Sequence, residues 1–345
     1  MTALLEARHV SKVFESGGTL LSRDKTVALE DFSLAIGGEH PSIVAIAGES
    51  GSGKTTLARL LLGIVSPSAG EILYAGKQLQ TMSQDEWMQF RREVQAIFQD
   101  PFEVYNPFYK VDHMLTTPIA KFHLANSKEA ARTLMERALQ GVGLRPEETL
   151  GRYPHQLSGG QRQRITIARA LLLSPRIIVA DEPVSMVDAS LRATILESLL
   201  RLNQEMRISI LYITHDLTTA YQLCENIVVL YRGSVAEVGS VESVIKDPMH
   251  PYTRLLVRSI PLPNPDLRWG TEQVGAAPAH GPRKTNKGCK FAGLCPHVMD
   301  LCYDALPPLF RTDSKRAVAC YLYKEQPLTD AAEVMSAPAL ASQTP

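Results

Sequence analysis

The sequence predicts an α/β protein whose core is a parallel sheet, with an antiparallel β subdomain and a helical subdomain added to it. Three observations predict this fold class. Short apolar stretches typical of buried strands alternate with helical patterns, as in parallel sheets with helical crossovers. The opening 36 residues alternate like the strands of a mixed or antiparallel sheet. Helical spacing then recurs in one block after residue 100, which predicts a helical insert.

The expected elements follow in order along the chain. A polar, glycine-bearing loop over 15–25 separates the first two strands. The expected strands are 3–14, 26–36, 41–48, 176–183 and 208–216, with a hairpin over 227–239 that turns on Arg232 and Gly233. The expected helices cover 54–64, 128–143 and 190–206.

Composition limits the possible functions. The chain has 345 residues, enough for two or three domains, and 45% of them are hydrophobic. Lys plus Arg equals Asp plus Glu at 36 each, so no overall basic charge favours a nucleic-acid partner. No apolar run approaches the roughly 20 residues that span a bilayer. We therefore expect a soluble, cytoplasmic protein that would serve a membrane only by docking on it.

A phosphate-binding motif is the strongest chemical signal. "GESGSGKT", residues 48–55, fits G-x-x-x-x-G-K-[ST] and lies between an expected strand and an expected helix. The glycines permit a tight loop that points N–H groups at phosphates. Lys54 would reach the β- and γ-phosphates, and the Thr55 hydroxyl would ligate Mg²⁺. The alternative is a chance glycine loop at a strand–helix junction, which this context disfavours.

Two later strands end on side chains suited to phosphate chemistry. Asp181 would hold the Mg²⁺ shell, and Glu182 could accept a proton from an attacking water. The alternative for this pair is a solvated acidic turn before Pro183. His215 ends the next buried strand, where the ligand sites of open α/β sheets gather; a structural histidine is the alternative.

A second anion site is expected where "LSGGQRQR", residues 157–164, runs into a helical pattern. Ser158, Gly159 and Gly160 would present bare backbone N–H groups at a helix N-terminus. This turn has no lysine, so it could complete a charged site but could not build one. Two isolated residues, Phe14 and Gln99, carry little information by themselves.

Together these motifs resemble an ABC-transporter nucleotide-binding subunit, in order and in approximate spacing, over roughly residues 4–258. The resemblance implies a P-loop ABC ATPase that binds ATP and Mg²⁺. It implies that two chains clamp two ATP molecules head to tail, so that each Ser-Gly-Gly turn binds the γ-phosphate of the opposite subunit's nucleotide. It also implies domains at 1–258 (ATPase, with a helical insert at about 100–175) and 259–325 (extension). The small residues of 326–345 indicate a disordered tail.

The resemblance also assigns roles residue by residue. Phe14 would stack on adenine, and Gln99 would touch Mg²⁺ or water and sense the permease. Glu182 would be the catalytic base, and His215 the switch histidine. Asp188 would lie at the dimer interface, in a loop where "SMVD" replaces the usual Ser-Ala-Leu-Asp. The residues expected around the phosphates are Gly48, Glu49, Ser50, Gly51, Ser52, Gly53, Lys54, Thr55, Thr56 and Asp181, with Ser158, Gly159, Gly160 and Gln161 from the opposite subunit.

The C-terminal segment resembles the extension of oligopeptide and dipeptide importer ATPases, from "HPYTRLLVRSIPLPNP" onward. The insert "SGGTLLSRDK" resembles the F-type member of the two ATPase subunits in such systems. Members of this family also import nickel or oligosaccharides. The implied partners are a second ATPase subunit, two permease subunits and an extracytoplasmic binding protein, at the cytoplasmic face of the inner membrane. A soluble ABC ATPase that acts on DNA or ribosomes is the alternative, but the long coiled-coil insertion or second cassette of such proteins is absent.

Four cysteines crowd into the C-terminal region with the spacing C-x5-C-x6-C-x17-C. Four thiolates suit a [4Fe–4S] cluster or tetrahedral zinc, and the gaps miss the short pairs of common zinc sites. Relatives with this extension are similar to proteins proposed to carry an iron–sulfur cluster, which favours iron. Reduced thiols that pack a small subdomain remain the third alternative. The four residues are Cys289, Cys295, Cys302 and Cys320.

Overall fold

The computed structural model describes residues 3–16, 24–100, 105–260 and 287–336. An eight-stranded sheet in the order β11-β12-β10-β9-β3-β8-β7-β6 forms its centre. The strands from β9 to β6 run parallel to one another, and β10 pairs antiparallel with β9. These strands are β3 (Ile43–Ala47), β6 (Val94–Ile97), β7 (Ile177–Asp181), β8 (Ser209–Thr214), β9 (Asn226–Tyr231), β10 (Ser234–Ser240), β11 (Phe310–Asp313) and β12 (Arg316–Val318).

A second, antiparallel sheet of four strands has the order β2-β1-β4-β5. Its strands are β1 (Leu5–Ser16), β2 (Asp24–Ile36), β4 (Ala69–Tyr74) and β5 (Lys77–Gln78). The parallel core, the antiparallel subdomain and the hairpin at Arg232 and Gly233 are therefore as predicted. Both hairpin residues have positive φ, 45° and 85°, which matches the tight turn of a two-residue hairpin.

Both faces of the main sheet are buried, so its strands are almost uniformly apolar. Along β3, Ile43 and Ala45 face one core while Val44 and Ile46 face the other. The first core is covered by α7 (Gly159–Leu171), α8 (Ala189–Met206) and α9 (Leu217–Leu223). The second is covered by α1 (Lys54–Leu61), α2 (Gln84–Glu93) and the antiparallel sheet.

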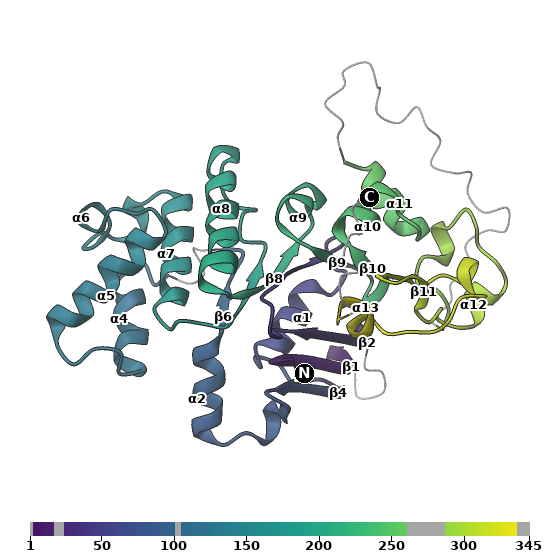
Figure 1. Cartoon of the computed structure of the whole chain (residues 1–345), viewed down its shortest axis with the longest axis horizontal. Coiled ribbons are helices and arrows are strands. Elements are labelled where there is room, and N and C mark those ends of the chain that lie inside the picture. Colours follow the sequence, from purple (N-terminus) through teal and green to yellow (C-terminus); the bar gives the residue numbers. More distant parts are fainter. Residues whose placement is uncertain (1–2, 17–23, 101–104, 261–286, 337–345) are drawn as a thin grey trace, which may run out of the picture.

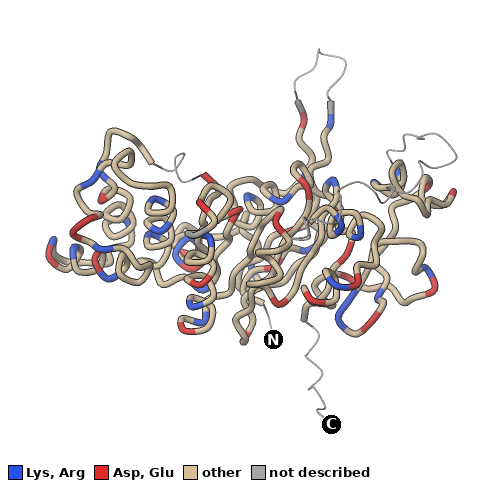
Figure 2. Tube along the Cα trace, turned by 90° about the horizontal axis from the view of Figure 1, so that it is seen from above, with Lys and Arg blue, Asp and Glu red and all other residues tan. Residues whose placement is uncertain are grey.

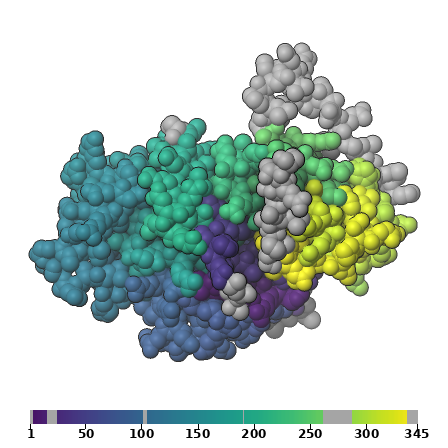
Figure 3. All heavy atoms as spheres, in the orientation of Figure 1, coloured from purple at the N-terminus to yellow at the C-terminus, as the bar shows by residue number. Residues whose placement is uncertain are grey.

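A helical segment lies at one end of the molecule's long axis and the C-terminal extension at the other, with the sheets between them (Figures 1 and 3). The helical segment falls within the block expected to be helical. Besides α7 it contains α4 (Asp112–Lys121), α5 (Lys128–Gly141) and α6 (Pro146–Thr149). Within the described part of the chain, no helix is both long and apolar enough to span a membrane.

The C-terminal extension is built onto the main eight-stranded sheet. Its strand β12 pairs antiparallel with β10, with Glu237 opposite Val318 and Val238 opposite Ala317. The remaining helices in this region are α10 (Val241–Lys246), α11 (Pro251–Arg258), α12 (Leu301–Asp304) and α13 (Ala331–Ser336). The sequence analysis did not anticipate this strand pairing, because β12 has only three residues and no strand pattern of its own.

The chain's end corrects one expectation. The small residues after 326 predicted a disordered tail, but residues 326–336 are ordered, and 337–345 lie outside the described residues. Ala331 and Val334 of α13 are buried in the core that contains β2. These two apolar side chains, together with an ion pair between Glu333 and Arg311, hold this short helix although the segment has few large apolar residues.

Glu237 fixes the extension to the core from a fully buried position. Its carboxylate accepts hydrogen bonds from the backbone N–H groups of Met249 (3.1 Å) and His250 (2.9 Å) and lies 3.8 Å from Arg316. We expect Glu237→Ala to lower the free energy of unfolding by about 3 kcal/mol, because it leaves two backbone N–H groups without their acceptor and removes an anion beside Arg316. Arg316 keeps its contacts with Asp247 and Asp313. Denaturant unfolding measures this, with Glu242→Ala, at an exposed pair with Lys246, as the control. Equal stability of the two variants would contradict this role.

Candidate active site

The loop over residues 48–55 connects β3 to α1 and has the backbone geometry of a phosphate cradle. Gly48, Gly51 and Gly53 have positive φ values of 151°, 80° and 102°. A Cβ atom on Gly53 would lie 2.3 Å from the carbonyl oxygen of Ala28 in β2, and one on Gly48 would lie 2.2 Å from the carbonyl oxygen of Leu230. These two glycines are therefore required by close backbone packing as well as by their φ angles.

Lys54 lies almost buried at the start of α1, and its ammonium group points back into the loop. Its Nζ donates hydrogen bonds to the carbonyl oxygens of Gly48 (2.7 Å) and Glu49 (2.9 Å). Burial lowers the pKa of Lys54, and the nearby carboxylates of Glu182, Asp181 and Glu49 act in the opposite direction. The loop therefore holds the Lys54 ammonium in place through its own carbonyl oxygens.

Asp181 ends β7 next to β8, where it pairs with Ile213, and its side chain is buried. Burial raises the pKa of this carboxyl, and a hydrogen bond with the Thr55 side chain opposes that shift. Among the described residues, Asp181 Oδ1 and Ser52 Oγ are buried without a hydrogen-bond partner. Buried oxygens of this kind are costly unless something binds them. The buried, unpartnered carboxylate oxygen of Asp181, beside the Thr55 hydroxyl and a phosphate loop, suits Mg²⁺.

Glu182 is held between two side chains that the sequence analysis had selected. Gln99 Nε2 donates a hydrogen bond to Glu182 Oε2 (2.9 Å), and His215 Nδ1 lies 3.1 Å from Glu182 Oε1. The backbone of Glu182 adopts φ 47°, unusual for a residue other than glycine, and its N–H donates to the carbonyl oxygen of Ile213. Glu182 is only 13% exposed, whereas His215 is 55% exposed. The structure therefore brings Gln99, Glu182 and His215 together beside Asp181.

The Ser-Gly-Gly turn differs in one respect from expectation. Ser158 is the N-cap of α7 and forms a capping box with Gln161, so the N–H groups of Ser158 and Gln161 are not bare. Helix geometry leaves the N–H groups of Gly159 and Gly160 without intrahelical acceptors. A Cβ atom on Gly160 would lie 2.5 Å from Leu191 of α8, so this glycine also permits close helix packing.

Two further predicted residues are exposed. Phe14 is 42% exposed, with Lys12 Nζ 5.2 Å from its ring centre. Phe14 pairs with Thr26 of β2. Two residues further along β2, the carbonyl oxygen of Ala28 lies against Gly53, so Phe14 is close to the phosphate loop. Asp188 is exposed at the N-terminus of α8 and makes no side-chain capping bond. Both side chains are available to a ligand or to another chain.

Comparison with known proteins decides the family. Residues 29–185 match the model described as "ABC transporter", and residues 236–302 match "Oligopeptide/dipeptide transporter, C-terminal region". The chain is 36% identical, over 93% of its length and 98% of the relative, to the di/tripeptide transport ATP-binding protein DppF of Pseudomonas aeruginosa (strain UCBPP-PA14). It belongs to the ABC transporter ATP-binding proteins.

Other comparisons agree with this ABC transporter ATPase assignment. The chain is 37% identical to the oligopeptide transport ATP-binding protein OppF of Escherichia coli (strain K12), over 80% of this chain and 83% of that protein. A post-hydrolysis dimer of the ATP-binding cassette MJ0796 with ADP and Pi matches with a TM-score of 0.61 and 29% identity, over 69% of this chain and 98% of that one. ATPases of this family couple ATP hydrolysis to transport.

The extension of this ABC transporter ATPase gathers its four cysteines around one small cavity. Cys289, Cys295, Cys302 and Cys320 all line it, and the Cys289 N–H donates to the Cys302 carbonyl oxygen at 2.7 Å. All four are free thiols. Burial raises the pKa of Cys289 and Cys320 to about 11. In the described part of the chain, no three or more His, Cys, Asp or Glu side chains are placed to hold a single metal ion.

One contact of the nucleotide loop was missed by the sequence analysis. The Tyr252 hydroxyl, from α11, accepts a hydrogen bond from the Glu49 N–H at 3.0 Å. The only sequence signal was the resemblance of "HPYTRLLVRSIPLPNP" to a family extension, and nothing in that string points to a loop 203 residues earlier.

Proposed function

We propose that this chain is the ATP-hydrolysing subunit of an importer for oligopeptides or dipeptides. The observation that carries the proposal is the direct attachment of a peptide-transporter type C-terminal region, residues 236–302, to an ATPase core that has a full set of hydrolysis side chains. The relatives named above are peptide transport proteins, which supports the same cargo class. Nickel and oligosaccharides are the alternative cargoes.

The site supports the following division of roles during hydrolysis. The phosphates bind to the loop of residues 48–56, which includes Lys54. Mg²⁺ would be held by Thr55 of the same loop together with Asp181 and Gln99. The ion, when bound, neutralises charge on the β- and γ-phosphate oxygens. Glu182 accepts the proton of the attacking water. Gln99 and His215 orient Glu182, because each contacts one of its two carboxylate oxygens.

We assign the second phosphate contact to a partner ATPase. Ser158, Gly159, Gly160 and Gln161 would face the γ-phosphate of the opposite subunit, with Asp188 at the interface and Phe14 on the adenine. A related but distinct ATPase is the proposed partner, with this chain as the F-type member. The segment that suggests the F type is "SGGTLLSRDK", and residues 17–23 of it lie outside the described residues.

A groove beside the Gln99 segment is suited to the permease. It has a volume of about 560 Å³ and is lined by Leu62, Tyr105, His113, Phe122 and Arg169 among others. Phe108, close to this lining in sequence, is 87% exposed. An apolar groove with a basic rim would accept a helix of a permease subunit, and Gln99 would report its movement to Glu182. We place the chain accordingly at the cytoplasmic face of the inner membrane, with two permeases and an extracytoplasmic binding protein.

Charge distribution gives no support to a nucleic-acid partner. Figure 2 shows Lys and Arg interspersed with Asp and Glu along the described part of the chain. Contacts of clustered Lys and Arg with phosphates supply most of the affinity of proteins for nucleic acids, so this mixed distribution does not favour a nucleic-acid partner.

We further propose that the four cysteines hold a [4Fe–4S] cluster in preference to zinc. The donor set fits, because four thiols surround one buried cavity and a cluster, unlike a single ion, bridges thiolates that do not converge on one point. The cavity is only about 10 Å³, so the thiolates would spread on binding. Anaerobically purified protein should contain about four iron atoms per chain and absorb in the visible range.

Serine replacement tests this assignment. Cys302→Ser should lose the iron and the colour, whereas Cys224→Ser, at the buried fifth cysteine outside this cavity, should keep both. A colourless, metal-free and fully folded wild-type sample would exclude the cluster.

Membrane co-purification tests the importer. The tagged chain, isolated from gently solubilised membranes of its own cell, should bring down two permeases and a second ATPase, and deletion of its gene should abolish uptake of labelled di- and oligopeptides. Ribosomal or DNA-repair partners without membrane proteins would contradict the proposal.

A further inference from the structure

Tyr252 connects the C-terminal extension to the nucleotide loop. It is 3% exposed, and its hydroxyl accepts the Glu49 N–H hydrogen bond described above. Burial raises the pKa of Tyr252 to about 12, so the hydroxyl is neutral at physiological pH. A neutral, buried hydroxyl holds this N–H without adding a charge that would repel phosphate.

The bond from Tyr252 acts on the same peptide group that holds the catalytic lysine. The Glu49 N–H and the Gly48 carbonyl belong to one planar peptide unit. Tyr252 binds its N–H side, and Lys54 Nζ binds its carbonyl oxygen at 2.7 Å. Because the unit is rigid, a shift of Tyr252 tilts the carbonyl and changes how firmly the loop retains the Lys54 ammonium.

Tyr252 in turn packs against the segment that carries the cysteines. The ring centre of Tyr252 lies 4.4 Å from the ring centre of Tyr231 and 5.7 Å from that of Phe291. The ring centres of Tyr231 and Phe291 are 5.4 Å apart, and these two rings pack edge to face. Phe291 lies between Cys289 and Cys295 in the sequence. The N-terminus of α11 is fixed as well, because the Tyr252 N–H donates to His250 Nδ1 at 3.0 Å.

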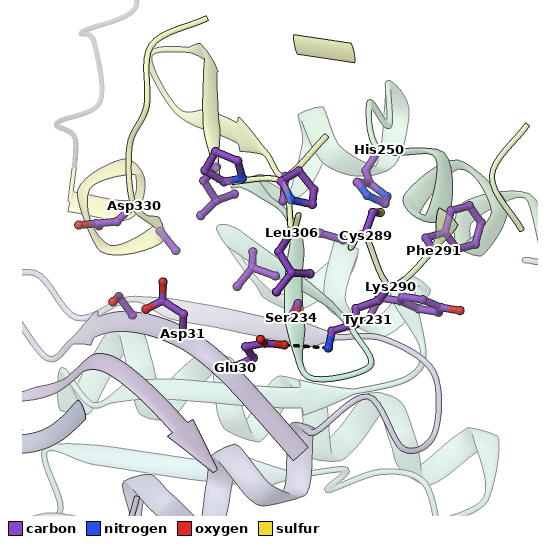
Figure 4. A pocket seen from close by; sticks show the side chains of 18 of the residues that line it. Glu30, Asp31, Tyr231, Ser234, His250, Cys289, Lys290, Phe291, Leu306 and Asp330 are labelled. Atoms are coloured by element: carbon purple, nitrogen blue, oxygen red, sulfur yellow. Dashed lines mark ion pairs between the residues drawn. The ribbon is translucent and has the colours of Figure 1, made fainter. Parts of the chain in front are cut away.

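A cavity of about 330 Å³ borders this aromatic cluster. Figure 4 looks into it: Tyr231, Phe291, Cys289 and His250 line one side, and Lys290 forms an ion pair with Glu30 of β2 at 2.8 Å. Phe291 is itself buried, and its contacts with Tyr231 and Tyr252 lead toward the nucleotide loop. Tyr231, Tyr252 and Phe291 are all buried in the main core, so a rearrangement of the cysteine segment is passed on to these rings through direct packing.

We propose that Tyr252 is a positioning residue for the nucleotide loop, through which the cysteine-bearing segment sets the affinity of the site for ATP. This inference rests on the proposed nucleotide site and adds to it a control point in the extension. Tyr252 lies outside the phosphate motif and acts through the peptide unit between Gly48 and Glu49.

The test is the affinity of the full-length chain for ATP and for a non-hydrolysable ATP analogue. Tyr252→Phe removes only the hydroxyl, and we expect it to raise the dissociation constant and the KM for ATP about 3- to 10-fold, the usual effect of one hydrogen bond. Turnover at saturating ATP should fall less than two-fold. Tyr323→Phe is the matched control, since its hydroxyl bonds the Met249 carbonyl oxygen but not the loop, and its affinity should equal that of the wild type.

A double-mutant cycle tests the connection to the extension. Phe291→Leu should weaken ATP binding about 2- to 5-fold in the wild type and should add nothing in the Tyr252→Phe background. Wild-type affinity in Tyr252→Phe, or full additivity of the two changes, would overturn the inference and leave the ATPase assignment intact. If the unaltered chain bound no ATP at all, both the proposed function and this inference would be contradicted.

Discussion

Replacement of Glu182 by glutamine should reduce ATP turnover by about 10²- to 10⁴-fold, the range expected for loss of a general base. The amide is nearly isosteric and can still accept the hydrogen bond from Gln99, so the site should keep its shape. It cannot take a proton from water. ATP binding should therefore persist, and steady-state hydrolysis together with equilibrium ATP binding would measure the two effects separately.

The bound nucleotide should then remain trapped, so the Glu182→Gln chain should accumulate as a closed dimer with its partner ATPase. Glu136→Gln, at an exposed ion pair with Arg132 on α5, is the control and should hydrolyse ATP normally. Near-normal turnover in Glu182→Gln would assign the proton acceptor to another group.

Gly53→Ala should weaken ATP binding by about 100-fold or more. Alanine at φ 102° is strained by about 1–2 kcal/mol, and its Cβ would lie 2.3 Å from the Ala28 carbonyl oxygen, which is fixed in β2. Overpacking against a fixed group adds about 1–3 kcal/mol. The loop can relieve both only by moving, and a displaced loop no longer directs its N–H groups and Lys54 at the phosphates.

Gly51→Ala separates the two causes. Gly51 also has positive φ, 80°, but a Cβ atom there would meet nothing within 4 Å. Calorimetric ATP titration should therefore show a much smaller loss for Gly51→Ala than for Gly53→Ala. Equal losses would mean that backbone strain alone, and not the contact with β2, decides the geometry of the loop.

Local patterns were sufficient to predict most of the site. The glycines and Lys54 lie in one short motif, and Asp181, Glu182 and His215 each follow a short apolar run that is typical of a buried strand. Adjacent parallel strands then bring these ends together. Gln99 was identifiable only through a family resemblance, because its contact with Glu182 spans 83 residues.

What could not be predicted depends on contacts between distant segments. The capping box satisfies the Ser158 N–H, which the sequence analysis took as bare, although Gln161 stands at the spacing that a capping box requires. The pairing of β12 with β10 and the packing of α13 join segments with weak patterns of their own. The bond between Tyr252 and Glu49 depends on the fold of both ends of the molecule.

The pairing of β12 with β10 has a consequence for synthesis of the protein. A ribosome completes β10 at Ser240 but does not produce β12 until Arg316. During that interval the ATPase sheet ends on an uncovered strand, and uncovered strands readily pair with other chains. Translation that stops between Ser240 and Arg316 would leave this edge permanently open. Such chains contain every residue of the ATP site, but they should aggregate and be degraded by proteases in the cell.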